Sequence, residues 1–181
     1  MCRFSGVFME NNKRYKKTEE LIQNVFIELT ETRGYSNVTV KDIVTRCGIN
    51  RNTFYLHYKD KEDLIDKMVF NILNEQKRKI SLIGKELSVK ETFKDLLYVV
   101  YEQIEFYRIL LKDPNLAGYF VRLENDIQEF VIENDDNFKN YPKIKTDYFI
   151  HGLLGIINKW IIYDRYSIEE IVNLIDELLV Y

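Results

Sequence analysis

The sequence contains few of the residues that interrupt helices or build cross-linked and metal-bound folds. Its 181 residues include only 7 glycines, 2 prolines and 2 cysteines. The cysteines, Cys2 and Cys47, are too few for a metal cluster and do not suggest a disulfide framework. We therefore expect reduced thiols and no cofactor. With so few helix breakers, the abundant Leu, Ile, Glu and Lys favour a helical fold.

Long apolar runs are also missing. No segment approaches the roughly 18 apolar residues that a membrane-spanning helix needs. The first residues, MCRFSGVFMENNKRYKK, lack an apolar run long enough for a signal peptide, and Met9 could be the true start. These absences predict a cytoplasmic globular protein without a membrane partner, and its length allows one large domain or two small ones.

Charge is divided unevenly along the chain, although the net charge is only −3. Residues 1–80 carry 15 Lys and Arg against 11 Asp and Glu, whereas residues 81–181 carry 11 against 18. The basic first part suggests a polyanion as its partner. Because this charge imbalance is modest, it does not identify the partner without the sequence motifs.

Helical periodicity and capping signals predict an all-α chain of about eight or nine helices with no strand. The clearest capping signals are the T-x-x-D run at 39–42, Asn50, the D-x-x-D run at 60–63, and S-x-x-E at 88–91 and 167–170. The expected helices cover about 13–33, 40–47, 51–57, 61–83, 89–111, 114–133, 143–163 and 168–180, with a loop over 134–142.

The most distinctive stretch is CGINRNTFYLHYKDKEDL, residues 47–64. Two short helices joined by a turn at Gly48 form a helix-turn-helix pattern. The second helix is roughly 12 Å long, the scale of the DNA major groove. Its period turns Ile49, Phe54 and Tyr58 inward. The polar residues that we expect to face outward are Arg51, Asn52, Tyr55, His57 and Lys59. Arg and Asn can make bidentate contacts to guanine and adenine.

The run TVKDIVTRCGINRNTFYLHYKDKEDLI resembles the DNA-binding domain of TetR-type transcriptional regulators, over about residues 13–65. The matching features are the capped helix at Thr39, the Gly48–Ile49 turn and T-[LF]-Y-x-H-[FY]-x-[ND]-K-x-x-L from Thr53 to Leu64. The resemblance implies base contacts from Arg51 and Asn52. It implies phosphate contacts from a second set: Thr39, Thr53, Tyr55, His57 and Lys61.

Two positions depart from the family pattern. The family usually has a small residue where Asn50 stands, so Asn50 either caps the helix or adds a base contact. Cys47 also occupies a position that the family fills with alanine or another small residue, and this suits a packed side chain better than a redox sensor.

Residues 88–181 are expected to form a separate helical domain, joined by a linking helix at 66–87; residues 1–12 are expected to be a flexible arm. The pattern F-x-x-G-x-x-G-I-I-x-x-W from Phe149 to Trp160 resembles the C-terminal region of some TetR-type regulators, whose last two long helices pair in a four-helix dimer interface. Two apolar stripes are too much for one small domain to bury, so they predict a homodimer interface. Its residues would be Leu153, Leu154, Ile157, Trp160, Ile161, Ile171, Ile175 and Leu178. An intrachain core is the alternative.

The resemblance also implies an effector pocket within the C-terminal helices. The candidate lining residues are aromatic, with one histidine as a polar handle: Tyr98, Tyr101, Phe106, Tyr107, Phe120, Tyr148 and His151. Taken singly, an aromatic residue at helical spacing is more often a core residue and a lone histidine is more often structural, so the sequence identifies no ligand.

Together these features predict a ligand-responsive homodimeric repressor that binds a palindromic operator in double-stranded DNA. An enzyme is not expected, because the sequence has no catalytic triad spacing, phosphate-binding glycine loop or metal motif. The alternative function is a helical adaptor or ligand-binding protein that keeps the fold without specific DNA binding.

Overall fold

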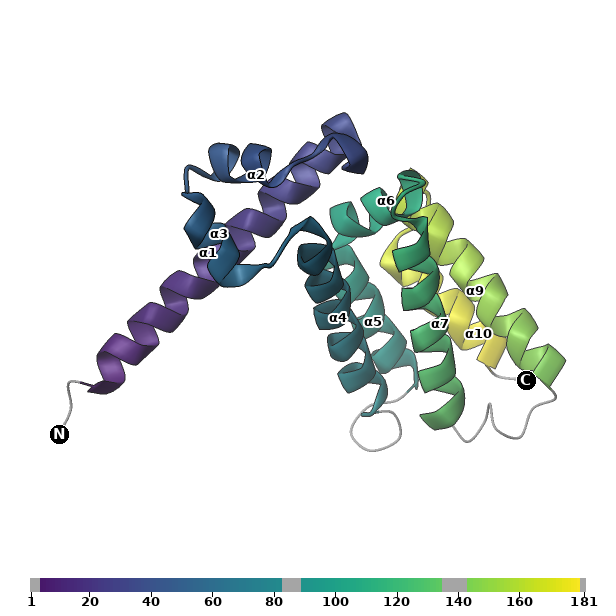
Figure 1. The fold of residues 1–181 in the computed structure, drawn as a ribbon. Helices are drawn as coiled ribbons and strands as arrows, with labels where there is room; N and C mark the ends of the chain where they lie inside the picture. The colour runs from purple at the N-terminus through teal and green to yellow at the C-terminus, as the bar shows by residue number, and fades with distance from the viewer. Residues whose placement is uncertain (1–3, 83–88, 135–142, 180–181) are drawn as a thin grey trace. The chain divides into compact units, whose positions relative to one another are not determined.

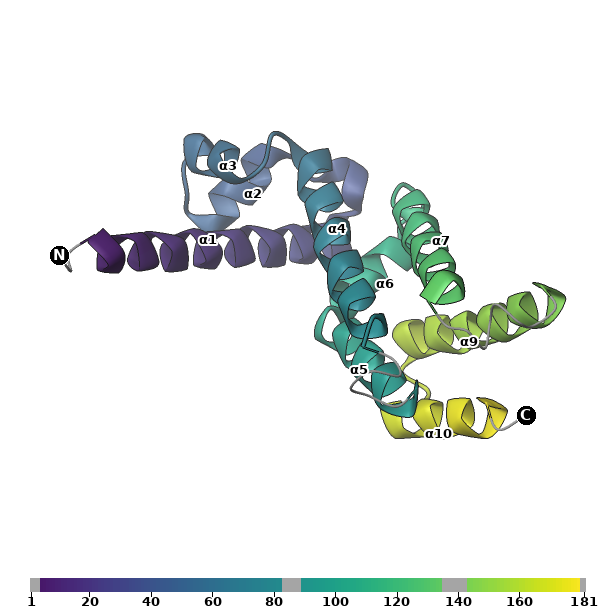
Figure 2. The ribbon, with the colours of Figure 1, turned by 90° about the horizontal axis from the view of Figure 1, so that it is seen from below.

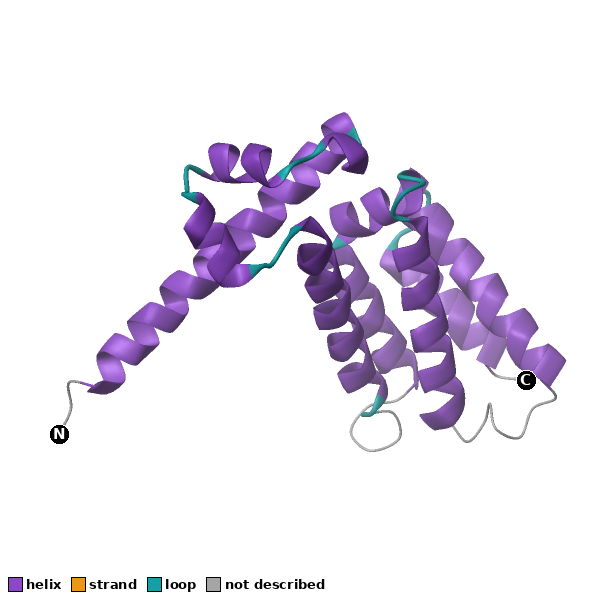
Figure 3. Cartoon of the chain, in the orientation of Figure 1, coloured by secondary structure: helices purple, strands orange, loops and turns teal. Residues whose placement is uncertain are grey.

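The computed structural model describes residues 4–82, 89–134 and 143–179, and every regular element in these ranges is a helix (Figure 3). The predicted all-α fold is confirmed. The elements in chain order are α1 (Phe4–Arg33), the 3₁₀ helix η1 (Tyr35–Asn37), α2 (Val40–Cys47), α3 (Arg51–His57), α4 (Lys61–Ile80), α5 (Val89–Glu102), α6 (Ile104–Lys112), α7 (Ala117–Asn134), α9 (Lys143–Tyr163) and α10 (Ile168–Leu179). No helix in the described ranges has the length and hydropathy to cross a bilayer.

The chain divides into two compact units, residues 1–68 and residues 69–181. The boundary falls inside α4, so this helix contributes its first turns to one unit and the rest to the other. The sequence predicts a linking helix at 66–87, of which residues 83–87 lie outside the described residues. Buried side chains run along α4 in both units, with Leu64 and Ile65 in the first and Ile72 and Ile80 in the second.

In the first unit, α2 and α3 lie against α1 (Figures 1 and 2). The contact is apolar and dry, since Ile22 and Phe26 of α1, Ile43 of α2 and Phe54 of α3 are all 0% exposed. Burying side chains of this size contributes about 1.5–3 kcal/mol each. This packing holds the two short helices, which are too short to be stable alone.

The capping signals fix the ends of the short helices as predicted. Thr39 and Asp42 form a full capping box at the start of α2, and Gly48 ends it in the left-handed region with φ 66°. The side chain of Asn50 caps α3 by accepting from the amide of Thr53 at 2.8 Å. A capping box between Ser167 and Glu170 also starts α10.

In the second unit, α5 packs on α10, and α6 packs on α7 and α9. Helices α9 and α10 lie side by side in both views (Figures 1 and 2). The centre of this unit is filled by large side chains that are at most 2% exposed: Leu97, Phe106, Leu110, Trp160, Ile161 and Ile171.

Three helix boundaries differ from the prediction. α1 begins at Phe4 instead of 13, because no proline interrupts the preceding residues and extending an existing helix is easy. The expected helix over 89–111 is broken at Gln103, whose φ and ψ of −116° and 20° are not helical. The two halves pack on different partners, and this tertiary packing overrides a periodicity that shows no interruption.

The third difference is the start of α7 at Ala117 instead of Pro114. Asp113 was expected to cap this helix. Its carboxylate instead accepts from the amide of Asn115 at 2.9 Å and closes a turn after α6. Of the expected loop 134–142, Asn134 is the last residue of α7, and the rest lies outside the described residues. The expected helix end near 83, the capping residue Ser88 and the end near 180 also lie outside them.

Candidate nucleic-acid interface and C-terminal cavity

The recognition candidate α3 is held from beneath by two aromatic side chains. Phe54 is 0% exposed and Tyr58 is 1% exposed, as predicted for inward positions. The amide of Gln23 on α1 donates to the Tyr58 hydroxyl at 3.0 Å, and burial raises the pKa of this phenol well above its ordinary value. A neutral, hydrogen-bonded tyrosine therefore fixes the C-terminal end of α3 against α1.

Four residues on the outward face of α3 are exposed: Arg51, Asn52, Tyr55 and Leu56. Tyr55 is 52% and Leu56 is 75% exposed. The seven residues of α3 make a helix roughly 10 Å long at 1.5 Å per residue, which fits a major groove about 12 Å wide. Sequence reasoning did not single out Leu56, although its apolar side chain on a polar face is a signal, because apolar groups can contact the thymine methyl.

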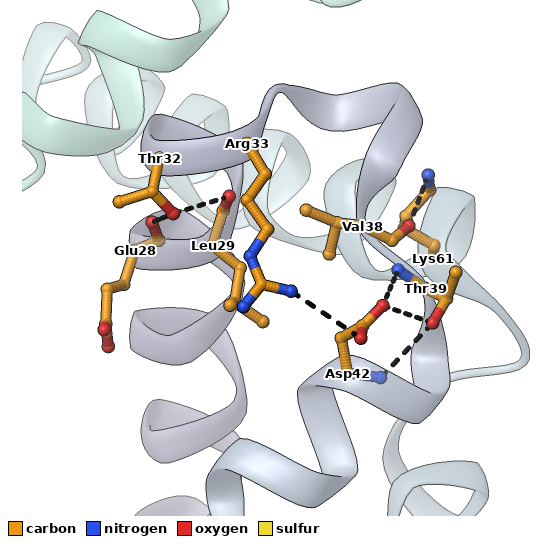
Figure 4. A network of polar contacts seen from close by, with 8 residues as sticks. All are labelled: Glu28, Leu29, Thr32, Arg33, Val38, Thr39, Asp42 and Lys61. Carbon is orange, nitrogen blue, oxygen red and sulfur yellow. Dashed lines mark hydrogen bonds and ion pairs between the residues drawn. The ribbon is translucent and has the colours of Figure 1, made fainter.

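The N-terminus of α2 carries a polar network (Figure 4). The hydroxyl of Thr39 accepts from the amide of Asp42 at 3.2 Å and donates to the carboxylate of the same residue. The Asp42 carboxylate accepts from both the hydroxyl and the backbone amide of Thr39, and these two bonds lower its pKa; the Arg33 guanidinium, 3.7 Å from the carboxylate, adds to the effect. Thr39 is exposed at this helix start, but its hydroxyl proton is already directed at Asp42.

Lys61 has a structural role that the sequence did not show. Its ammonium donates to the carbonyl of Tyr35 at 2.8 Å and to that of Val38 at 2.9 Å, and it lies 3.8 Å from the centre of the Tyr35 ring. Figure 4 shows the bond to Val38 beside the start of α2. In this structure Lys61 therefore ties the start of α4 to η1 instead of pointing at solvent as a phosphate donor.

His57 was predicted to face outward, and this orientation is wrong. The side chain is only 5% exposed and its ring stacks on Tyr15 of α1, with 4.0 Å between ring centres. Burial lowers the pKa of the imidazole below its ordinary value of 6.5. The reason is that Tyr15 of α1 covers this edge of α3, which the period of α3 alone could not reveal.

The same contact brings a basic stretch of α1 beside α3. Tyr15 stacks on His57 and its hydroxyl donates to the carbonyl of Leu56 at 3.4 Å, a long hydrogen bond. Around Tyr15, four cationic residues are exposed: Lys13, Arg14, Lys16 and Lys17. Sequence reasoning missed them as site residues, although the run KRYKK was a visible charge signal.

Asn50, Thr53 and Cys47 behave as parts of the scaffold. The amide oxygen of Asn50 accepts from both the backbone and the hydroxyl of Thr53. Of the two alternatives for Asn50, the structure therefore shows the cap. Cys47 is partly buried and burial raises the pKa of its thiol, which suits a packed side chain better than a reactive one.

Two family patterns match this chain. Residues 27–68 match the bacterial regulatory proteins of the tetR family, and residues 88–181 match a transcriptional regulator C-terminal region. The chain belongs to the TetR family. Its first unit carries that family's helix-turn-helix, and its relatives are transcriptional regulators, so the expectation that it is no enzyme is confirmed.

Curated relatives agree with this family. The chain is 33% identical over 151 residues to the HTH-type regulator YxbF of Bacillus subtilis, covering 81% of this chain but 40% of that protein. It is 25% identical over 135 residues to DhaS, the dhaKLM operon activator of Lactococcus lactis, covering 72% of this chain and 69% of DhaS. The chain thus spans about two fifths of the length of YxbF.

Solved TetR-family structures share the fold. A regulator from Syntrophomonas wolfei has a TM-score of 0.68 at 22% identity, with 88% of this chain and 91% of that chain covered. The structure of DhaS has a TM-score of 0.61 at 23% identity, with 90% and 94% covered. At these identities the likeness concerns the fold alone.

The second unit of this TetR-family chain contains a cavity of about 120 Å³. It is lined by residues of α4, α5, α6, α7 and α9, most of them apolar. Of the predicted pocket residues, Tyr107 and Phe120 line it. Tyr98, Tyr101 and Tyr148 are 41%, 56% and 84% exposed and do not. Phe106 is buried outside the lining, and His151 is exposed, with its ring nitrogen 2.7 Å from the carbonyl oxygen of Asp147.

The structure describes the side chains of six of the eight residues expected at a dimer interface. Leu153, Leu154, Ile157 and Ile161 line the cavity, while Trp160 and Ile171 are 2% and 1% exposed. Trp160, Ile161 and Ile171 are therefore buried within the subunit, as in the alternative, whereas Leu153, Leu154 and Ile157 are half-buried, and the dimer interface itself stays a prediction. The side chains of Ile175 and Leu178 are outside the described residues. The sequence period identified an apolar stripe correctly but could not say which partner covers it.

Proposed function

We propose that this chain is a ligand-responsive homodimeric repressor that binds a palindromic operator through α3. The observation that carries the proposal is the outward face of α3, where Arg51, Asn52, Tyr55 and Leu56 are exposed above a buried aromatic base. Arg51 and Asn52 read base edges, because their planar groups can make paired hydrogen bonds to guanine and adenine. A regulator of this kind acts where the chromosome is, and this is the basis for predicting a cytoplasmic location.

Contacts to phosphates come mainly from exposed residues beside α3. Tyr55 can donate its hydroxyl, and the lysines of α1 bring charge. Lys13, Lys16 and Lys17 are exposed, so each can replace a counterion on the DNA. Thr39 and Thr53 could donate to phosphates only by giving up hydroxyl bonds that they already make, and Lys61 already directs two of its three N–H groups at backbone carbonyls. His57 is left out of this interface because its ring is covered.

The homodimer is proposed to form through the opposite face of α9 from the one first expected. The residues on this face are exposed at helical spacing: Ile144, Tyr148, Gly152, Gly155 and Tyr163. Tyr148 is 84% and Ile144 is 78% exposed. A β-carbon built at Gly152 or Gly155 would meet nothing within 4 Å. Glycine costs a helix about 1 kcal/mol relative to alanine, so close approach by a second copy is a reason to keep both.

Selection of bound DNA from a random pool, followed by a binding titration, tests the operator part. Arg51→Ala should relax base preference at one position and cost about 1–3 kcal/mol, whereas Lys16→Ala should weaken binding to all sequences and lower the salt slope by about one. Arg78→Ala removes another exposed arginine, from the second unit, and is the matched control. Absence of binding beyond the nonspecific level would favour the adaptor.

Light scattering tests the dimer. Gly152→Arg should shift the protein toward the monomer, since a long charged side chain would enter the α9 face where a second copy must approach closely. Gly118→Arg, the same change at an exposed glycine of α7 where an added β-carbon would also meet nothing within 4 Å, is the matched control. If Gly152→Arg leaves the dimer intact, this face is not the interface.

The sign of regulation is tested separately. Among similar proteins, DhaS is named an operon activator and NalD of Pseudomonas aeruginosa a secondary repressor of a multidrug efflux pump. For this chain we propose repression, which a promoter–reporter fusion measures directly. Expression should rise when α3 loses Arg51 and fall when the intact protein is supplied.

A further inference from the structure

The cavity in the second unit is apolar except for a few side chains at its wall. Its polar lining includes Gln76 of α4, Glu124 of α7 and Asn158 of α9. Within the described residues, some of the hydrogen bonds that these side chains could make are missing. The missing bonds indicate which chemical groups a ligand of the cavity would carry.

Asn158 leaves a buried acceptor without a partner. Its amide nitrogen donates to the carboxylate of Glu124 at 3.1 Å, while its amide oxygen is buried and makes no hydrogen bond within the described chain. A carboxylate can only accept, so Glu124 fixes the amide with its nitrogen toward α7 and its oxygen unpaired. Buried acceptors are rarely left unpaired, because losing water without gaining a donor is costly.

Gln76 repeats this pattern deeper in the wall. The side chain is 7% exposed, its nitrogen donates to the hydroxyl of Tyr107 at 3.0 Å, and its oxygen is buried without a partner. Burial also raises the pKa of the Tyr107 phenol, so this hydroxyl stays neutral. The tyrosine hydroxyl can act as donor or acceptor, so the Gln76 amide is less constrained than that of Asn158, which carries the argument.

Glu124 adds a charge to the same wall. Its carboxylate accepts from Asn158, and no Lys or Arg of the described chain forms an ion pair with it. Burial raises the pKa of Glu124, against the bond from Asn158 and the weaker influence of His151. The ionised carboxylate is therefore poorly compensated at this position, and a cation placed against it would restore the balance.

We propose that the cavity binds a small hydrophobic amine, whose ammonium donates to Glu124 and Asn158 while its apolar body fills the remaining space. The volume of about 120 Å³ is smaller than the engineered cavity of about 150 Å³ that takes up benzene in another protein, so the apolar body of the amine is at most a single ring. A carboxylic acid fits poorly, because it would set a second negative charge against Glu124. The claim that this amine is an effector rests on the proposed regulatory function, whereas the claim that it binds the cavity does not.

Calorimetric titration of the full chain at pH 7 with benzylamine, benzyl alcohol and benzoate tests the proposal. The three probes share a ring and differ in charge. Benzylamine should bind at least about tenfold more tightly than benzyl alcohol, and benzoate should not bind, because a hydrogen bond to a charged group is roughly twice as strong as a neutral one.

Glu124→Gln keeps the size of the side chain and removes its charge. It should weaken the binding of benzylamine by about ten- to a hundredfold and change the affinity for benzyl alcohol little. Glu129→Gln, an exposed substitution on the same helix with the same charge change, should leave both unchanged. The proposal is overturned if the three probes bind alike, or if Glu124→Gln binds benzylamine as the parent does. Should that variant fail to fold, the ranking of probes on the parent chain still decides.

A DNA titration without and with benzylamine separates the two claims. Specific DNA binding together with no preference for the amine would overturn the ligand and keep the regulator. Amine binding without specific DNA binding would support the site and overturn the proposed function.

Discussion

Replacing Lys61 with methionine should destabilise the protein instead of removing a DNA contact. Methionine keeps the apolar stem of the side chain and removes the ammonium, which donates to two backbone carbonyls at 2.8 and 2.9 Å. Hydrogen bonds to charged groups contribute about 1.5–3 kcal/mol each. Because Lys61 is only partly buried, we discount them to roughly 1 kcal/mol each. The expected loss is about 2 kcal/mol.

The melting temperature converts this loss into a measurable shift. A unit of this size changes by about 4–8 °C per kcal/mol, and a chain of about 180 residues that melts as one unit by about 2–4 °C. Lys61→Met should therefore lower the melting temperature by at least about 4 °C. Lys59→Met removes an exposed lysine two positions away and should change stability by no more than about 0.5 kcal/mol.

The salt dependence of DNA binding provides the opposing outcome. Removing a lysine that contacts a phosphate lowers the slope of log affinity against log salt concentration by about one. Removing a lysine with only a structural role leaves this slope unchanged, when it is measured on folded protein. If Lys61→Met has the same melting temperature as the parent protein and its salt slope falls by about one, the carbonyl contacts contribute little to stability and Lys61 is a phosphate ligand.

Further substitutions test the scaffold around α3. Burial lowers the pKa of His57, so around and below pH 6.5 the unfolded chain binds more protons than the folded one, and stability decreases as the pH is lowered. His57→Phe should keep the stack on Tyr15 and make the melting temperature less dependent on pH between about pH 7.5 and 5.5. A drop of equal size in the variant would show that another group titrates. Gly48→Ala should cost about 1–2 kcal/mol in urea unfolding, because Gly48 has φ 66°. Asn50→Ala should cost about 1 kcal/mol by removing the cap, and an unchanged midpoint would show that the cap contributes little.

The parts of the fold that follow from short stretches could be predicted from the sequence. Thr39, Asn50 and Ser167 each start a helix by bonding an amide only three residues away, so their effect is contained in the local sequence. The break at Gln103 depends instead on which helices receive the residues before and after it. No local signal records that competition, and the apolar spacing continues through the break.

The candidate site follows the same division. Phe54 and Tyr58 were predicted inward correctly because they are four residues apart on one helix. His57 lies three residues after Phe54, so the period alone leaves it at the edge of the buried face. Tyr15 of α1 decides its burial, and that contact is made across more than forty positions of chain. The cavity is likewise assembled from five helices, which explains why isolated aromatic residues predicted so little of its wall.

The polar groups at the start of α2 and α4 and those on α1 should differ in what they contribute to DNA binding. The Thr39 hydroxyl already donates to Asp42, so a phosphate there would exchange one bond for another, and such an exchange gains little free energy. Lys61 holds two backbone carbonyls, and these bonds restrict how far its ammonium can move toward a phosphate. The exposed lysines of α1 surrender only water and counterions when they meet DNA. The sequence-independent part of the affinity should therefore come mainly from α1, a helix outside the motif that first suggested DNA binding.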